Sequence, residues 1–130
     1  MKNILVIEDD PFTIDFYVFL FKKAGFNPIV LEDGDKVLQT LGTEEISLII
    51  MDINLKNTYL NGEKIDGIML SKIIKEQDKY SKLPILLVTA YSPNLKGEKY
   101  FKESLAEDFI TKPIVDFNAL LKKVNTLISQ

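Results

Sequence analysis

The stretch Ile4-Leu5-Val6-Ile7-Glu8-Asp9-Asp10-Pro11 joins a run of branched apolar residues to three acids and a proline. Three later stretches follow the same plan, in which an apolar run ends at one functional group: 48–51 before Asp52, 85–88 before Thr89-Ala90, and 109–111 before Lys112-Pro113. Runs rich in Ile, Leu and Val that do not alternate with polar residues predict strands buried on both faces of a parallel sheet. Ligands of such sheets bind beyond the carboxyl ends of the strands, so these groups should converge on one site.

Between these runs the sequence alternates strands with helices. The patterns predict strands over residues 3–8, 27–31, 46–51, 84–89 and 108–111, helices over about 11–24, 34–41, 66–79, 95–106 and 115–128, and a long loop over 53–65. This alternation predicts a single α/β domain over residues 1–130, with a doubly wound five-stranded parallel sheet of order 2-1-3-4-5 in a flavodoxin-like three-layer sandwich. In that order the first and third strands are neighbours, so Glu8-Asp9 and Asp52 would lie side by side.

Composition excludes several classes of function. The chain has 130 residues, a hydrophobic content of 46%, and a net charge of −3 from 16 basic and 19 acidic residues, so it offers no basic surface for nucleic acid. Without cysteine or histidine it has no disulfide, no thiol nucleophile and no thiolate or imidazole metal site. Hard oxygen ligands remain, and these suit Mg²⁺, or Mn²⁺ as an alternative.

The N-terminal residues enter a strand without a signal-peptide apolar region, and no apolar stretch approaches the roughly 20 residues of a membrane span. We therefore expect a cytoplasmic chain with no membrane partner.

The acids that follow the first and third strands predict a metal site. We expect Asp9 and Asp52 to bind the cation directly, Glu8 to bind it through water, and the backbone carbonyl of Asn54 to complete the protein ligands. The alternative is a solvated strand end with no metal. Asp10 directly precedes Pro11 and is interpreted as a helix N-cap rather than a ligand.

The same groups predict phosphoryl transfer. The Asp52 carboxylate is the candidate nucleophile and would hold an acyl phosphate, while the metal and Lys112 would neutralise charge on the transferring group. Thr89 would donate its hydroxyl, and Ala90 its backbone N–H, to the same phosphate. A cis bond between Lys112 and Pro113 would turn the ammonium into the site; otherwise Lys112 would be an ordinary surface lysine.

Taken together, these residues resemble the receiver domain of two-component response regulators. The resemblance covers essentially the whole chain and depends on the fragments at 4–11, 48–55, 66–67, 87–90 and 109–113, which are weak alone and specific in this order. It implies that Asp52 takes phosphate from a phosphohistidine on a sensor kinase or a histidine phosphotransfer protein, with Mg²⁺ as cofactor and slow self-hydrolysis as the chain's only enzymatic activity.

The resemblance also implies a switch. In the family a threonine moves toward the phosphate and an aromatic residue rotates inward; those positions are Thr89 and Phe109 here, and Phe109 is alternatively a plain core aromatic. Asn54 and Tyr91 occupy the positions that line the phosphate site and its entrance in the family, where they should control access of water and so the lifetime of the phosphoryl group.

Two features depart from the family pattern. About seven extra residues lie in the stretch 56–65 before Asp66-Gly67, either as a neutral insertion or as a lid or specificity loop beside the site. The first helix carries Ile14, Val18 and Phe19 away from its expected core face, either as scattered surface residues or as a docking patch for the phosphate donor.

We therefore expect a stand-alone receiver that signals through contacts with a downstream protein. A non-phosphorylated pseudo-receiver would have lost an acid, the threonine or the lysine, and none is lost. A metal-dependent phosphatase would need a second carboxylate at the position of Asn54, which argues against that class. Flavin binding is disfavoured because the acids would repel the flavin phosphate.

Overall fold

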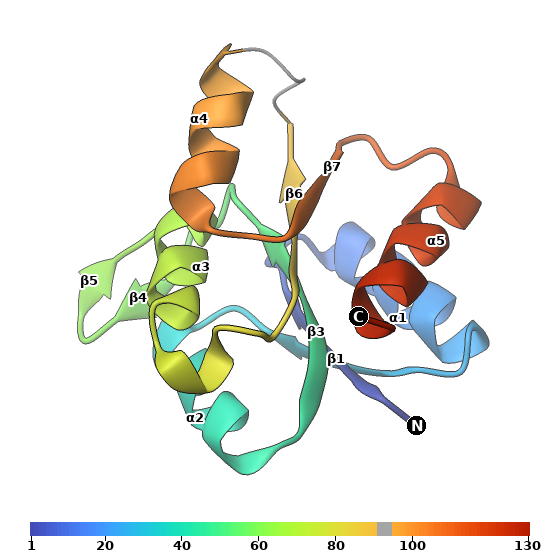
Figure 1. The fold of residues 1–130 in the computed structure, drawn as a ribbon, viewed down its shortest axis with the longest axis horizontal. Helices are drawn as coiled ribbons and strands as arrows, with labels where there is room; N and C mark the ends of the chain where they lie inside the picture. The colour runs from blue at the N-terminus through green and yellow to red at the C-terminus, as the bar shows by residue number, and fades with distance from the viewer. Residues whose placement is uncertain (91–94) are drawn as a thin grey trace.

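The computed structural model describes residues 1–90 and 95–130, and its central element is a parallel five-stranded sheet (Figure 1). The strands stand in the order β2-β1-β3-β6-β7, and every neighbouring pair is parallel. Their bounds are β1 Asn3–Ile7, β2 Asn27–Leu31, β3 Ile46–Asp52, β6 Ile85–Thr89 and β7 Asp108–Thr111. The predicted order of the five main strands is confirmed, with strand ends that differ from prediction by a residue at most.

Helices cover both faces of the sheet, as a three-layer sandwich requires. They are α1 Pro11–Lys23, α2 Gly34–Thr43, α3 Gly67–Lys75, α4 Leu95–Ser104 and α5 Phe117–Ile128. The N-cap interpretation of Asp10 is confirmed, because its carboxylate accepts a hydrogen bond from the Thr13 N–H. The third helix is shorter than predicted: it ends at Lys75, and a separate 3₁₀ turn, η1, follows over Asp78–Tyr80.

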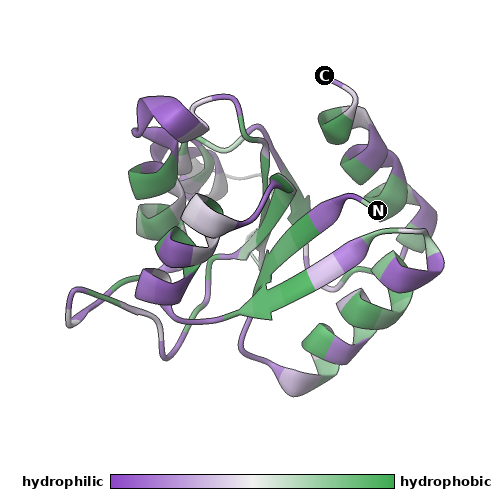
Figure 2. Cartoon of the chain, turned by 90° about the horizontal axis from the view of Figure 1, so that it is seen from below, coloured by the Kyte–Doolittle hydropathy of each residue, from purple (hydrophilic) through white to green (hydrophobic). Residues whose placement is uncertain are grey.

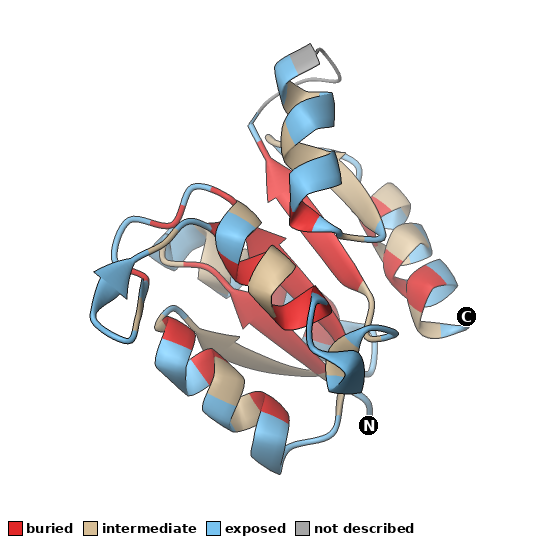
Figure 3. Ribbon diagram, turned by 60° about the vertical axis from the view of Figure 1, so that its left-hand side comes forward, coloured by how far each residue is buried: buried red, intermediate tan, exposed pale blue. Residues whose placement is uncertain are grey.

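Alternate residues of the central strands point to two separate cores. Ile4 and Val6 of β1 face α1 and α5, whereas Leu5 and Ile7 face α2 and α3. Figure 3 shows the central strands as the most buried elements, and Figure 2 shows them as mostly apolar, between helices that carry both apolar and polar residues. Because both faces are covered, the strands carry the unbroken apolar runs seen in the sequence. No helix of the described residues is long and apolar enough to span a bilayer.

The segment expected to be a plain loop contains a small hairpin. β4 (Tyr59–Leu60) pairs antiparallel with β5 (Glu63–Lys64) across the two-residue turn Asn61-Gly62. Both turn residues have positive φ, 52° at Asn61 and 82° at Gly62, which is the backbone of a type I′ turn. The Asn-Gly pair is the strongest short signal for such a hairpin, and it was present in the sequence.

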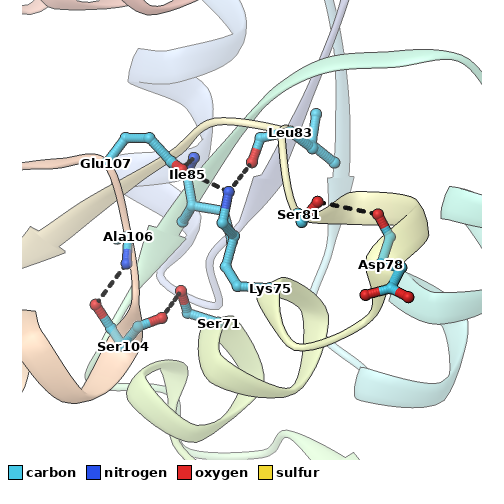
Figure 4. A network of polar contacts seen from close by, with 9 residues as sticks. All are labelled: Ser71, Lys75, Asp78, Ser81, Leu83, Ile85, Ser104, Ala106 and Glu107. Carbon is cyan, nitrogen blue, oxygen red and sulfur yellow. Dashed lines mark hydrogen bonds and ion pairs between the residues drawn. The ribbon is translucent and has the colours of Figure 1, made fainter.

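A network of polar contacts joins α3 to the segments that enter β6 and β7, at the edge of the sheet opposite the functional groups (Figure 4). The buried Lys75 ammonium donates to the Leu83 carbonyl at 2.8 Å and pairs with the Glu107 carboxylate. Glu107 in turn accepts the Ile85 N–H at 2.8 Å. The lysine is therefore fixed as a crosslink between α3 and the two strands.

Replacing the buried lysine should destabilise the protein measurably. Lys75→Met keeps most of the side-chain volume but leaves the Leu83 carbonyl and part of the Glu107 carboxylate without a donor, so we expect a loss of about 1–3 kcal/mol in the free energy of unfolding by urea titration. Lys123→Met is the control, because its pair with Asp108 at 3.0 Å is partly exposed and should cost less than about 1 kcal/mol. Equal losses in the two variants would contradict this description of the network.

Candidate functional site

The three predicted acids meet where β1 and β3 end. Ile7 is the register partner of Met51, so Glu8 and Asp9 leave β1 directly beside Asp52, the last residue of β3. One carboxylate oxygen from each acid lies within 4.8 Å of the others. Like charges at such distances repel one another, and a bound cation relieves the repulsion.

Glu8 is the most unusual of the three. Its side chain is 1% exposed, and neither carboxylate oxygen has a hydrogen-bond partner among the described residues. Burial, reinforced by the neighbouring Asp52 carboxylate, raises the pKa of Glu8 from 4.5 to about 8. A buried carboxyl without a partner is costly, so the oxygen-rich set Glu8, Asp9 and Asp52 fits a hard divalent cation such as Mg²⁺.

Lys112 enters this cluster from the end of β7. Its Nζ lies 3.1 Å from Oδ2 of Asp52 and 3.7 Å from Oε1 of Glu8. The Lys112 N–H donates to the Thr89 carbonyl at 2.8 Å, which holds the residue against the end of β6, and the Lys112–Pro113 peptide bond is cis. A fixed ammonium beside a carboxylate is suited to neutralising an anion that joins that carboxylate.

Asp52 itself is 4% exposed, and its Oδ1 accepts the Asn54 N–H at 3.1 Å. Asn54 is exposed beside it. On the next strand Val88 is the register partner of Asp52, so Thr89 and Ala90 follow just beyond the acid; Thr89 is buried and Ala90 is exposed. The predicted residues Glu8, Asp9, Asn54 and Lys112 therefore lie around the Asp52 carboxylate, and Thr89 and Ala90 end the neighbouring strand on the same side of the sheet.

Phe109 lies farther along the sheet, in β7. It is half-buried, and its ring is 5.3 Å from the ring of Phe101 in α4, so it packs between the sheet and that helix. The predicted entrance residue Tyr91 lies outside the described residues.

Sequence reasoning missed the role of Gly67 beside Asp52. A Cβ at Gly67 would lie 2.0 Å from the Asp52 carbonyl oxygen and 2.7 Å from the Ile53 Cα. The Asp66 carboxylate caps the helix that begins here by accepting the Met69 N–H. The pair Asp66-Gly67 therefore lets α3 start directly against the backbone of Asp52. In the sequence, this contact is indicated by the Asp-Gly pair that follows the inserted stretch 56–65.

A family model described as the response regulator receiver domain matches residues 4–125. The chain belongs to this family of receiver domains.

Curated relatives of the receiver include proteins of different overall size. The chain is 30% identical over 129 residues to the alkaline phosphatase synthesis transcriptional regulatory protein PhoP of Bacillus subtilis, covering 95% of this chain and 48% of PhoP. It is 26% identical over 114 residues to the polar-differentiation response regulator DivK of Brucella anthropi, covering 87% of this chain and 85% of DivK. The receiver therefore spans about half the length of PhoP and most of DivK.

Solved structures share the fold. The signal receiver domain of a histidine kinase from Syntrophus aciditrophicus superposes with a TM-score of 0.84 at 26% identity, covering 99% of this chain and 91% of that one. The receiver domain of a sensor histidine kinase from Pseudomonas aeruginosa, solved with a magnesium ion coordinated in its active-site cleft, gives 0.82 at 20% identity, covering 99% and 98%.

Adding a methyl group at Gly67 should disturb the backbone at Asp52. Gly67→Ala forces the Cβ into the Asp52 and Ile53 backbone, so we expect a loss of about 1–3 kcal/mol in the free energy of unfolding. Gly42→Ala is the control, because a Cβ there meets nothing within 4 Å and should leave stability unchanged or raise it by up to about 1 kcal/mol. Urea unfolding measures both, and a Gly67→Ala protein as stable as the parent would contradict the close approach.

The pKa of Glu8 gives the metal-free receiver a pH-dependent stability. Because that pKa is about 8 in the folded chain against 4.5 ordinarily, the folded state binds the proton more tightly. The contribution is complete below pH 4.5 and is lost as pH rises through about 8. In EDTA, the thermal unfolding midpoint of wild type should fall relative to that of Glu8→Gln as the pH rises across this range. Midpoints that change with pH in the same way for both proteins would contradict the raised pKa.

Proposed function

We propose that this receiver is a phosphorylation-dependent signalling switch in which Asp52 accepts a phosphoryl group from a phosphohistidine, with Mg²⁺ as cofactor. The donor is a sensor histidine kinase or a histidine phosphotransfer protein, and the output is a contact with a downstream protein. The observation that carries the proposal is the position of the Asp52 carboxylate, 3.1 Å from the Lys112 ammonium and within 4.8 Å of two further acids.

The cation would be held by Asp9 and Asp52, with Glu8 close by and the Asn54 carbonyl as a further oxygen donor. When bound, Mg²⁺ would supply positive charge that offsets the negative charge of the carboxylates and of the incoming phosphoryl group. Two observations support the fit: the donor set consists of oxygens alone, and the buried Glu8 carboxyl has no hydrogen-bond partner among the described residues. The magnesium-bound receiver from Pseudomonas aeruginosa is consistent with it.

In the transfer, a carboxylate oxygen of Asp52 forms a bond to phosphorus as the P–N bond to the donor imidazole breaks. The electron pair of that bond stays on the imidazole nitrogen, which takes up a proton from water. Lys112 would neutralise charge on the transferring group, Thr89 would donate its hydroxyl to a phosphoryl oxygen, and Ala90 would donate its backbone N–H to the same phosphate. Slow attack of water on the acyl phosphate would return Asp52 to the free carboxylate. We propose no enzymatic activity for this chain beyond its own phosphoryl transfer and this hydrolysis.

Signal output would run through Thr89 and Phe109. Thr89 ends β6, and Phe109 lies on the neighbouring strand with its ring against Phe101 of α4. A shift of the threonine toward a phosphate would change the packing under Phe109 and so the position of α4. The surface of α4, β7 and α5 is then the part of the molecule that a downstream protein would read.

The phosphate donor would dock beside Lys112. An open pocket of about 530 Å³ there is lined by Phe12 and Phe16 of α1 and by Pro113 and Ile114 after β7, and it reaches Ala90 and Lys112. Phe12 is 85% exposed, so an apolar side chain already projects at the rim. Of the docking residues proposed from sequence, Phe19 is exposed, whereas Ile14 and Val18 are half-buried. The exposed Phe12 beside the pocket supports docking at the start of α1.

Intact-mass spectrometry after incubation with acetyl phosphate tests the proposal. We expect one phosphoryl adduct on wild type with MgCl₂, none with EDTA, and none on Asp52→Asn under either condition. Asp108→Asn is the matched control, since its carboxylate pairs with Lys123 away from the site, and it should gain the same adduct as wild type. No adduct on wild type with MgCl₂ would contradict the proposal and favour a pseudo-receiver. An adduct on Asp52→Asn would contradict it by showing that another residue accepts the phosphoryl group.

A further inference from the structure

The stretch 56–65, which lengthens this receiver between β3 and α3, is a folded element attached to its surroundings at both ends. The β4–β5 hairpin closes on itself through the Ile65 N–H, which donates to the Thr58 carbonyl at 3.0 Å. Figure 1 shows it standing beside α3 and above the start of α2. β5 is exposed, whereas Leu60 of β4 is half-buried against Gly34 at the start of α2, and further contacts of the hairpin's base and turn hold it in place.

Two of these contacts go to the segment that begins α2. The Thr58 side chain is fully buried, and its hydroxyl donates to the Glu32 carbonyl at 2.6 Å. At the tip, the Asn61 N–H lies 3.2 Å from both carboxylate oxygens of Asp35. A buried hydroxyl that satisfies a carbonyl is costly to remove, so Thr58 fixes the base of the hairpin.

The third contact goes to the metal site. The backbone N–H of Lys56, the first residue of the stretch, donates to Oδ2 of Asp9 at 2.8 Å. A carboxylate has two oxygens and about four lone-pair sites, so Asp9 can accept this bond and still bind a cation. The bond fixes the orientation of a side chain that has to approach two other carboxylates.

We propose that the hairpin is a positioning element for the divalent cation, acting through the hydrogen bond from the Lys56 N–H to Asp9. The inference rests on the proposed function, because it concerns the same Mg²⁺ site. Hydrogen bonds that orient metal ligands commonly matter by about 10–100-fold in metal affinity. The extra residues are therefore neither a neutral insertion nor a mobile lid: they hold Asp9 in its binding orientation before the cation arrives.

Isothermal titration with MgCl₂ tests the inference on matched variants. Lys56→Pro and Lys56→Ala both remove the ammonium, but only the proline removes the N–H, so the difference between them isolates the hydrogen bond. We expect the Mg²⁺ Kd of Lys56→Pro to be raised about tenfold and that of Lys56→Ala to stay within about twofold of wild type. A Kd for Lys56→Pro equal to that of Lys56→Ala would overturn the inference.

Circular dichroism in EDTA reports whether each variant is folded. Should Lys56→Pro fail to fold, Thr58→Val is measured instead, because it removes the hydrogen bond at the hairpin base without changing an acid. A Mg²⁺ Kd raised at least threefold in Thr58→Val supports the inference, and an unchanged Kd overturns it. If wild type itself binds no Mg²⁺, the metal site of the proposed function fails and the inference with it. If wild type binds Mg²⁺ and the variants bind it with the same Kd, the inference is overturned and the proposed function is not.

Discussion

Repulsion among three carboxylates, balanced by one ammonium, is the constraint on which the rest of the site depends. Glu8, Asp9 and Asp52 are held together because β1 and β3 are neighbours in register, and the apolar runs that fix this register are buried on both faces. Lys112 offsets part of the charge at Asp52 and Glu8. In the function proposed above, the remaining negative charge would give the site its affinity for a cation and, through the cation, for a phosphoryl group.

Most of the fold was predictable from the pattern of apolar residues. The runs at 4–7, 48–51 and 85–88 are unbroken because both faces of each strand are covered, and unbroken runs that alternate with helices leave few topologies open. The hairpin was missed because its strands are only two residues long, too short for Tyr59-Leu60 and Glu63-Lys64 to show a strand pattern, although Asn61-Gly62 marked the turn. The early end of α3 at Lys75 was missed because Lys75 turns inward to a buried pair that sequence does not reveal.

The site was predictable to a different degree. Strand ends in a parallel sheet meet at one edge, so the grouping of Glu8, Asp9, Asp52, Thr89 and Lys112 followed from the topology. Contacts made by the backbone could not be predicted from the sequence, because the identity of a residue does not determine where its N–H points or how closely two backbone segments approach. The Lys56 N–H on Asp9 and the approach of Gly67 to the Asp52 carbonyl are both of this kind, and both act on the orientation of an acid.

Chemical trapping of the phosphorylated residue tests the central claim most directly. Borohydride reduces an acyl phosphate to an alcohol, so treatment after incubation with acetyl phosphate and MgCl₂ would convert a phosphorylated aspartate into homoserine, and peptide mapping would locate it. The account predicts conversion at Asp52 alone, since this is the carboxylate that Lys112 approaches most closely. Conversion at Glu8 or Asp9, or at no residue of a folded protein that binds Mg²⁺, would contradict it.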